Sequence, residues 1–456
     1  MKRDMTTGNV VVSLLYFIVP LTLGNILQQL YNLVDTYIVG RYVGSLALSA
    51  VGSVSNLIFI LNAVVLGLKA GISVICSESY GSRNERDFNA SRTVGFVLIV
   101  TAGLLCTIFG LAEAKNIMVF IKVPDAIFQD AYVYFRIILM GYPFVFLFNY
   151  AIAITQSRGN SNITFIALLT STISNIILDL LLICNFKLGV NGAAIATVIS
   201  QALSMIIVFT NLITKVPRSR IGIGIELAKI KAKDILRVSL PSILQQGILS
   251  MGIVLISALI NQCGTAMIAG VAIGGKIDGI ISLPIITIAE ALAVFTAQNI
   301  GAGKPERVEI GLKAAIRLCG VMVVALSLFI YFKGRSIIGL FMSEYDKAIV
   351  DEGMNYIISL LVMLVFMIFF RCYIGVVTGK KEMRFVLLAF TLNIISRVSF
   401  AYATFSTLGK WAVYIANPLS VLVGAITIMT AYRYQKNTPL DSILLRSYNK
   451  STSTEV

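Results

Sequence analysis

The fold class is decided by residues 20–35, whose sequence is PLTLGNILQQLYNLVD. They lie inside an apolar segment, residues 13–40, which is long enough to cross a lipid bilayer as a helix. Asp35 is the exception, because an ionisable side chain in hydrocarbon is costly and indicates a functional site. The alternative interpretation is a carboxylate at the end of the span that reaches water through the lipid headgroups.

Polar side chains share one face of this helix with Asp35. At about 100° per residue, that face carries Gln28, Tyr31 and Asn32. Pro20 interrupts the backbone hydrogen bonds earlier in the helix and predicts a kink. A kinked membrane helix that carries a carboxylate suggests a moving element that binds a cation.

The composition of the whole chain indicates a polytopic membrane protein. Of the 456 residues, 57% are hydrophobic and 13% are charged, and the mean hydropathy is +0.88. The net charge of +15 is distributed over loops, as topology signals are, so we expect no nucleic-acid partner. The short basic start leads into an apolar segment too long for a signal peptide, and we expect no cleaved leader.

The absence of histidine argues against an enzyme. It removes His-ligated metals, His-activated nucleophiles and His proton relays. The six cysteines lie in or beside apolar segments and form no CxxC pair, so we interpret them as packing residues. We expect no cofactor.

Twelve apolar segments predict an all-α membrane protein with twelve transmembrane helices. Their approximate ranges are 13–38, 46–76, 93–112, 127–155, 163–184, 191–213, 236–260, 267–297, 312–332, 354–377, 385–406 and 412–434. The loops carry 24 Lys and Arg residues on the side of the two termini and 8 on the opposite side. By the positive-inside rule, both termini are predicted to be cytoplasmic.

The two halves of the chain repeat at an offset of about 220 residues. The matching pairs are Gly44 with Gly264, Gly81 with Gly301, Gly159 with Gly379, Gly189 with Gly409, Pro20 with Pro241 and Asn175 with Asn393. A repeat this long predicts two pseudo-symmetric six-helix bundles with the substrate path between them. The predicted divisions are residues 1–214 for the first lobe, 215–237 for a basic cytoplasmic linker, and 238–456 for the second lobe and a cytoplasmic tail.

A second polar constellation lies in the fifth and sixth spans. Asn175 and Asp179 are four residues apart and share a helix face, and Thr197 adds another oxygen from the sixth span. Together with Asp35, these side chains predict a cation site in the first half, since Asp35 aligns near Ile256 and Asp179 near Arg397 in the second. The alternative is a set of separate polar packing residues.

Other charged residues fall inside the predicted spans. Glu290 lies deep in the eighth span, where it could attract a cationic substrate or pair with another span. The basic residues within spans are interpreted mainly as snorkelling side chains; they are Lys69, Arg136, Lys276, Arg371 and Arg397.

Several ordered stretches resemble the multidrug and toxic compound extrusion (MATE) family of transporters. They are PLTLGNILQQLYNLVDTYIVGRYVG, SESYGSRN, NIILDLLLI, LGVNGAAIAT and TAQNIGAGK. The resemblance covers nearly the whole chain and implies two six-helix lobes around a central cavity. It also implies export of organic, often cationic, compounds in exchange for H⁺ or Na⁺ by alternating access.

The resemblance also implies which residues couple the cation. The site residues of prokaryotic members fall on Asp35, Asn175, Asp179 and Thr197, where Na⁺ binding is expected if sodium is the coupling ion. A supporting network falls on Pro20, Gln28, Tyr31 and Asn149. The seventh and tenth helices carry Gln245, Gln246 and Arg371 instead of the acidic residues of some members, so the chain is closest to the branch coupled in the first lobe.

The expected partners are small organic substrates and the lipid bilayer of a bacterial cytoplasmic membrane, with no obligate protein partner. The alternative function is a flippase for a lipid-linked oligosaccharide or a related amphiphile. A cavity for anionic phosphates should carry several basic residues, whereas the polar set of the first half is acidic.

Overall fold

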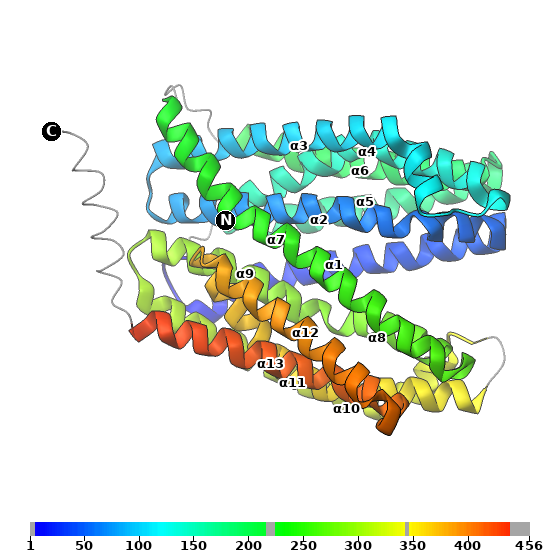
Figure 1. Cartoon of the computed structure of the whole chain (residues 1–456). Coiled ribbons are helices and arrows are strands. Elements are labelled where there is room, and N and C mark those ends of the chain that lie inside the picture. Colours follow the sequence, from blue (N-terminus) through cyan, green and yellow to red (C-terminus); the bar gives the residue numbers. More distant parts are fainter. Residues whose placement is uncertain (1–4, 216–223, 343–345, 438–456) are drawn as a thin grey trace. The chain divides into compact units, whose positions relative to one another are not determined.

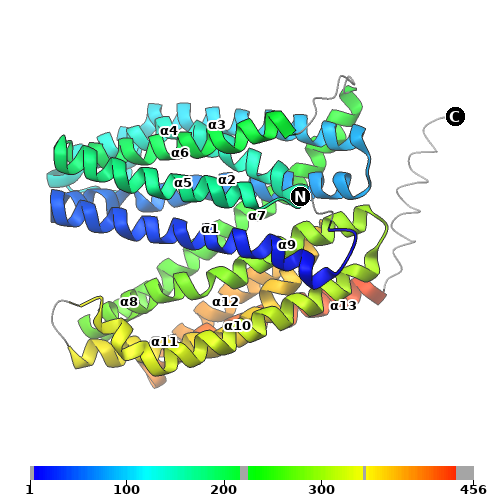
Figure 2. The same cartoon turned by 180° about the vertical axis from the view of Figure 1, so that it is seen from behind.

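The computed structural model describes residues 5–215, 224–342 and 346–437, and every regular element in them is a helix (Figures 1 and 2). The α-helices are α1 Val10–Ile38, α2 Ser45–Gly81, α3 Glu85–Phe120, α4 Asp125–Ser157, α5 Asn162–Asp179, α6 Gly189–Lys215, α7 Ile225–Ile260, α8 Thr265–Ile281, α9 Leu283–Gly301, α10 Pro305–Gly339, α11 Lys347–Gly379, α12 Met383–Leu408 and α13 Lys410–Asn437. Short turns of other pitch are η1 Val39–Val43, η2 Leu180–Asn185 and η3 Asn261–Cys263.

Twelve segments of the described residues are long and apolar enough to cross a membrane, which confirms the predicted fold class. The helices are longer than the apolar segments. For example, α3 spans Glu85–Phe120, and its first turns carry polar and charged residues. The predicted eighth span is divided into α8 and α9 at Ser282, because Pro284 at the start of α9 lacks the N–H that would continue the helix.

The backbone repeats its special conformations at the offset of 220 residues. Gly44 and Gly264 have φ of 115° and 92°, and Gly189 and Gly409 have φ of 57° and 54°. These angles favour glycine because a side chain is strained there. Equivalent turns after equivalent helices are what a duplicated six-helix unit produces.

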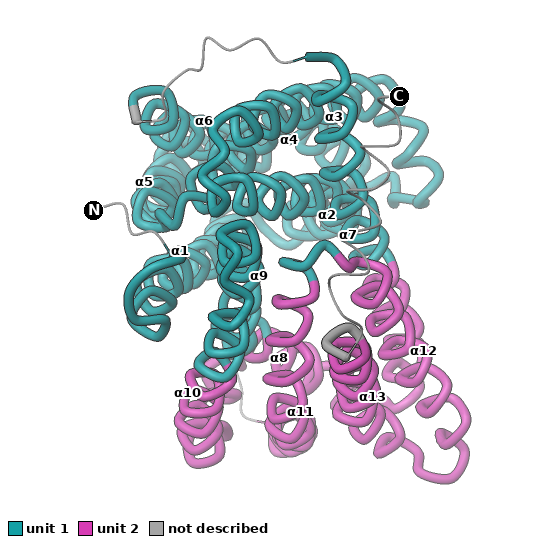
Figure 3. The backbone as a smooth tube through the Cα atoms, turned by 90° about the vertical axis from the view of Figure 1, so that its left-hand side faces the viewer, with its two compact units in different colours: residues 1–247, 279–315, 378–381 teal, residues 248–278, 316–377, 382–456 magenta. Residues whose placement is uncertain are grey.

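The chain divides into two compact units, shown in different colours in Figure 3. Unit 1 comprises residues 1–247, 279–315 and 378–381, and unit 2 comprises residues 248–278, 316–377 and 382–456. Within unit 1, α5 contacts α1 and α6, and α4 contacts α6 and α2. α9 contacts both α1 and α2, so it completes a ring of neighbouring helices.

Unit 2 has its own apolar core, which includes Ile256, Met267 and Ala401. A polar cluster accompanies it, where Lys410 forms an ion pair with Glu352 and Tyr414 donates to the same carboxylate at 2.7 Å. Pro418 leaves the carbonyl of Tyr414 without its helical partner, and the hydroxyl of Ser359 donates to that carbonyl at 2.5 Å.

The predicted linker and tail fall partly outside the described residues. Residues 216–223 and 438–456 are not among those described, whereas residues 225–237 form the first turns of α7 and continue directly into the seventh span. The charged beginning of α7 belongs to unit 1, where Lys231 forms an ion pair with Asp87 at 2.9 Å.

The topology prediction can be tested by labelling single cysteines in intact cells. Lys229 and Lys115 are exposed and fall on opposite sides of the predicted topology. In a variant without the native cysteines, Lys115→Cys should react with a membrane-impermeant maleimide from outside, and Lys229→Cys only after permeabilisation. External labelling of Lys229→Cys would contradict the orientation.

Candidate functional site

Two carboxylates lie near the ends of helices in unit 1 that continue into wider π-helical turns. Asp35 lies four residues before η1, and Asp179 is the last residue of α5 and immediately precedes η2. The two wider turns contact each other. π-helical turns occur frequently at functional sites, because they re-aim neighbouring side chains and backbone groups.

The side chains of Asp35 and Asp179 meet. Their carboxyl groups are near enough to share a hydrogen bond, which requires a proton on one of them. Asp179 is 0% exposed, both of its carboxylate oxygens are buried without a donor, and Oδ1 of Asp35 is in the same situation. Two ionised carboxylates in a low-dielectric site repel each other, and either a proton or a bound cation would relieve that repulsion.

Neutral polar groups surround this carboxylate pair. Asn175, one turn before Asp179, is 0% exposed, and neither its Oδ1 nor its Nδ2 has a partner. Thr197 of α6 shares a hydrogen bond of 3.4 Å with the hydroxyl of Tyr31. Tyr31 is within electrostatic range of both carboxylates. The four predicted coupling residues therefore come from three helices of one unit.

Tyr134 of α4 is a site residue that the sequence analysis missed. It is buried, and its hydroxyl lies within electrostatic range of Asp35, Asp179 and Tyr31. The sequence signal was weak, because Tyr134 stands in an aromatic run, AYVYFR, that reads as packing. The neighbouring Arg136 is directed elsewhere, with its guanidinium 5.4 Å from the ring of Tyr132.

The carbonyl that Pro20 leaves without its helical partner is bonded by a residue just before α5, which the sequence also did not indicate. Because proline has no N–H, the carbonyl of Tyr16 loses its helical hydrogen bond. The hydroxyl of Ser161 donates to that carbonyl at 3.4 Å. α1 runs continuously from Val10 to Ile38 through Pro20, and Gly24 brings it against Leu168 of α5. This contact fixes the helix that carries Asp35 beside the helix that carries Asp179.

Three other residues predicted for the site form no hydrogen bond with the carboxylate pair among the described residues; they are Gln28, Asn149 and Glu290. Gln28 is exposed, and Asn149 donates to the carbonyl of Val145 on its own helix at 2.9 Å. Within the described residues, neither side chain donates a hydrogen bond to the carboxylate pair. Glu290 takes the second of its two predicted roles, since it forms an ion pair with Lys69 of α2 at 3.5 Å.

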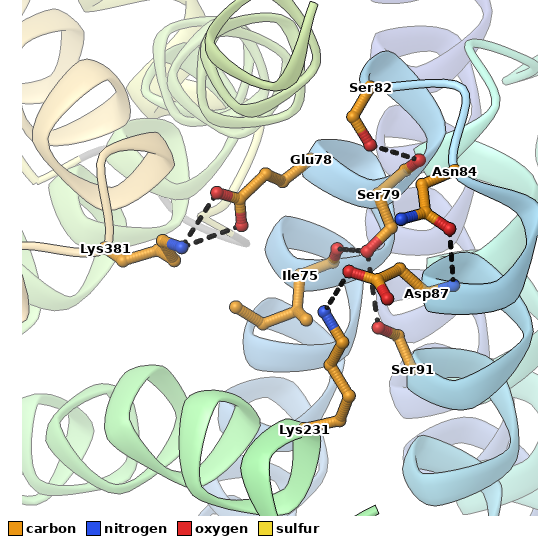
Figure 4. Close-up of polar contacts among 9 residues, drawn as sticks. All are labelled: Ile75, Glu78, Ser79, Ser82, Asn84, Asp87, Ser91, Lys231 and Lys381. Atoms are coloured by element: carbon orange, nitrogen blue, oxygen red, sulfur yellow. Dashed lines mark hydrogen bonds and ion pairs between the residues drawn. The ribbon is translucent and has the colours of Figure 1, made fainter. Parts of the chain in front are cut away.

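The end of α2 carries a second polar cluster in unit 1 (Figure 4). Lys381 donates to both carboxylate oxygens of Glu78 at 2.8 Å, while Ser79 and Ser91 join α2 to α3. Asn84 begins α3 by accepting from the N–H of Asp87. The stretch SESYGSRN is thus a structural corner between two helices.

Beside this cluster, α2 and α9 approach each other through two glycines. A Cβ at Gly81 would lie 2.0 Å from the carbonyl oxygen of Gln298, and a Cβ at Gly301 would lie 2.1 Å from that of Glu78. Gly301 and Gln298 are equivalent to Gly81 and Glu78 at the offset of 220, so the contact is reciprocal. Only glycine permits backbones to approach this closely.

The donor set at the carboxylate pair fits a hard monovalent cation. Asp35 and Asp179 supply charge, Asn175 and Thr197 supply neutral oxygens, and the buried carboxylate oxygens have no donor within the described chain. Carboxylate, amide and hydroxyl oxygens are the ligands that hard cations prefer. A proton on one carboxyl group would relieve the same repulsion.

Twelve spans and a buried carboxylate pair define the class of the protein, which is a polytopic membrane protein with two acidic side chains inside one unit. The sequence model of the MatE family matches residues 20–181 and 241–403. The chain therefore belongs to the MATE family of multidrug efflux transporters, and it is a multi-pass membrane protein.

Named relatives and solved structures are similar over most of their length. The chain is 28% identical over 348 residues to the probable multidrug resistance protein YoeA of Bacillus subtilis (strain 168), covering 73% of this chain and 74% of YoeA. It is 27% identical over 444 residues to the probable multidrug resistance protein YpnP of the same organism, covering 94% and 96%. An outward-facing MATE family transporter structure has a TM-score of 0.89 at 24% identity, covering 95% of this chain and 97% of that one.

Proposed function

We propose that the protein exports organic, often cationic, compounds across the bacterial cytoplasmic membrane in exchange for inward H⁺ or Na⁺. The coupling ion binds at Asp35, Asn175, Asp179 and Thr197. The observation that carries the proposal is the pair of adjacent carboxylates with donor-less oxygens in a membrane-spanning unit. Intramembrane carboxylates of this kind are typical of ion and proton pathways.

The coupling follows from the electrostatics of the pair. Without a cation, the two carboxylates repel and α1 and α5 are driven apart; with a proton or Na⁺ they draw together. Each ion neutralises the same site, so H⁺ and Na⁺ compete. If the substrate favours the conformation that the cation disfavours, the two exchange instead of binding together.

The proposed arrangement has two six-helix lobes, residues 1–214 and 238–456, that rock about a central path. The two separate matches of the family sequence model, which begin at residues 20 and 241, support this division. So do the equivalent glycine turns at Gly44 and Gly264. Both termini lie in the cytoplasm in this arrangement.

The function is tested in proteoliposomes that contain the purified protein. Na⁺ and pH gradients are imposed separately, and the transport of a cationic fluorescent dye is followed. At least one of the two gradients should drive the dye against its own concentration gradient. If the protein binds the dye but neither gradient drives dye transport, the proposed antiport function is wrong.

Asn175→Ala provides a graded test of the cation site. The substitution removes one neutral oxygen and leaves both carboxylates, so the affinity for the coupling ion should fall by about 2- to 10-fold. The measurement is the ion concentration that gives half-maximal thermal stabilisation of the purified protein. Thr170→Ala, on a half-buried position of α5 where the hydroxyl donates to the carbonyl of Ile166 on its own helix, is the matched control and should leave that concentration unchanged. An unchanged ion affinity in Asn175→Ala would exclude that residue from the site.

A further inference from the structure

Two buried donors lie one turn apart on α12 in unit 2. Asn393 is 6% exposed, and its Nδ2 has no hydrogen-bond partner. Nε of Arg397 is also buried without a partner. Leaving a buried donor unsatisfied destabilises the fold, and more so for a charged group. Both donors lie near the middle of a membrane-spanning helix, so the fold is destabilised at two neighbouring positions.

Among the described residues, Nε of Arg397 lacks an acceptor although charged and polar groups lie near the guanidinium group. Asp278 of α8 and Tyr356 of α11 lie within electrostatic range of the guanidinium group. Asp278 lowers the cost of the buried positive charge. A guanidinium group has five N–H donors in a planar fork, however, and Nε of Arg397 faces no acceptor in the described residues.

An aromatic wall adjoins these donors. Phe390, one turn before Asn393 on the same face of α12, lies 4.9 Å from the ring of Phe370 and 5.4 Å from the guanidinium group of Arg371. Gly424 of α13 brings its backbone against Phe370 and Asn393, since a Cβ there would lie 2.7 and 3.2 Å from their side-chain atoms. The wall is therefore closely packed on the side of α13.

The sequence repeat relates this pair to the cation site. Asn393 matches Asn175 at an offset of 218, and Arg397 matches Asp179 at the same offset. The amide is the same in both halves, whereas the charge is inverted. At the second position of the pair, both carboxylate oxygens of Asp179 lack a donor in the described part of unit 1, and Nε of Arg397 lacks an acceptor in that of unit 2.

We propose that Arg397 and Asn393 bind an anionic oxygen group, such as a carboxylate, sulfonate or phosphate, of an amphiphilic molecule. The proposal rests on the export function proposed above and defines its substrate class as compounds that carry such a group beside an apolar body. A guanidinium fork and an amide donate charge-assisted hydrogen bonds to an anionic group. Phe390 and Phe370 are themselves buried, and they place the donors in an apolar environment where such hydrogen bonds are stronger.

The test uses two dyes that differ in one group. Rhodamine B carries a free carboxylate, and its ethyl ester does not. Binding to the purified full-length protein in phosphatidylcholine nanodiscs is followed by fluorescence polarisation. The native protein should bind rhodamine B more tightly than the ester. Arg397→Gln should weaken the binding of rhodamine B about tenfold, as expected for a charge-assisted hydrogen bond, and leave the ester unchanged.

Further variants separate a binding role from a structural one. Arg397→Lys keeps the charge but loses the fork, so an intermediate loss for rhodamine B alone is expected. Asn393→Ala should weaken the binding of rhodamine B about threefold. Lys276→Gln is the matched control, because this exposed lysine lies over the ring of Phe341 at 5.8 Å, and it should bind both dyes as the native protein does. If Arg397→Gln does not fold, Arg397→Lys and Asn393→Ala decide the result.

A second arm identifies a lipid source of the anionic group. In nanodiscs of phosphatidylglycerol, a bound headgroup should raise the melting temperature of the native protein above its value in phosphatidylcholine, and Arg397→Gln should abolish that difference. Equal binding of the two dyes by the native protein, together with no effect of phosphatidylglycerol, would overturn the proposal. These measurements need no ion gradient, so they stand apart from the efflux test of the proposed function.

Discussion

Asp179→Asn is expected to abolish gradient-driven efflux while leaving the protein folded. The carboxylate is fully buried, and neither of its oxygens has a donor, so a neutral amide of the same shape fits without steric change. The variant lacks a charge that we propose binds the coupling ion, and a coupling free energy of about 1–3 kcal/mol corresponds to a loss of about 5- to 150-fold. Efflux of a cationic dye from proteoliposomes measures this loss.

Asp35→Asn should have the same effect, because either carboxylate alone leaves the site with half of its charge. Asp125→Asn is the control, since Asp125 is an exposed residue at the start of α4. It should transport as the native protein does. Normal gradient dependence in Asp35→Asn or Asp179→Asn would remove that carboxylate from the coupling site, and the melting temperature of each variant reports whether it is folded.

Gly81→Ala is expected to disrupt the contact between α2 and α9. The added Cβ would lie 2.0 Å from the carbonyl oxygen of Gln298 and 2.7 Å from its carbonyl carbon. Backbone atoms cannot rotate away as a flexible side chain can, so the helices must separate at a cost of about 1–3 kcal/mol or more. Conformations in which this end of unit 1 is open should gain population, and turnover should fall.

The opening can be measured at Ser157, which is fully buried and whose carbonyl accepts from the amide of Gln298 at 2.6 Å. In a background without other reactive cysteines, a maleimide should label Ser157→Cys slowly in the parent and rapidly when Gly81→Ala is added. Gly52→Ala is the matched control on the same helix, where a new Cβ meets nothing within 4 Å. Equally slow labelling with Gly81→Ala would show that the contact tolerates a side chain.

The number and approximate position of the membrane helices could be predicted because hydropathy is a local property. A span needs about twenty apolar residues wherever it stands in the fold. The division of the eighth span at Ser282 was not predicted, although Pro284 was visible, because many membrane helices continue through proline. α1 does so at Pro20, and only the hydroxyl of Ser161, far away in the sequence, shows how its freed carbonyl is satisfied.

The candidate site was predicted in part for a similar reason. Asp35 and Asp179 were identifiable because a carboxylate is costly in an apolar span, and Asn175 shares a helix face with Asp179. Tyr134 carries no such signal, because a tyrosine is common in a membrane helix, and its role depends on which helix lies opposite. For the same reason, the ion-pair partner of Glu290 could not be predicted, because Lys69 lies in the other half of the sequence.

The sequence by itself determined the class of the protein, its twelve spans, its duplicated halves and the residues that hydrocarbon makes costly. The spans and the costly residues follow from the free energy of transferring each side chain from water to lipid, which needs no knowledge of neighbours. The duplication follows from residues that recur at an offset of about 220. Only the tertiary structure decided which further polar groups meet: Tyr31 with Thr197, Glu290 with Lys69, and Glu78 with Lys381. Pairing depends on the directions of side chains on different helices, and packing between helices fixes those directions.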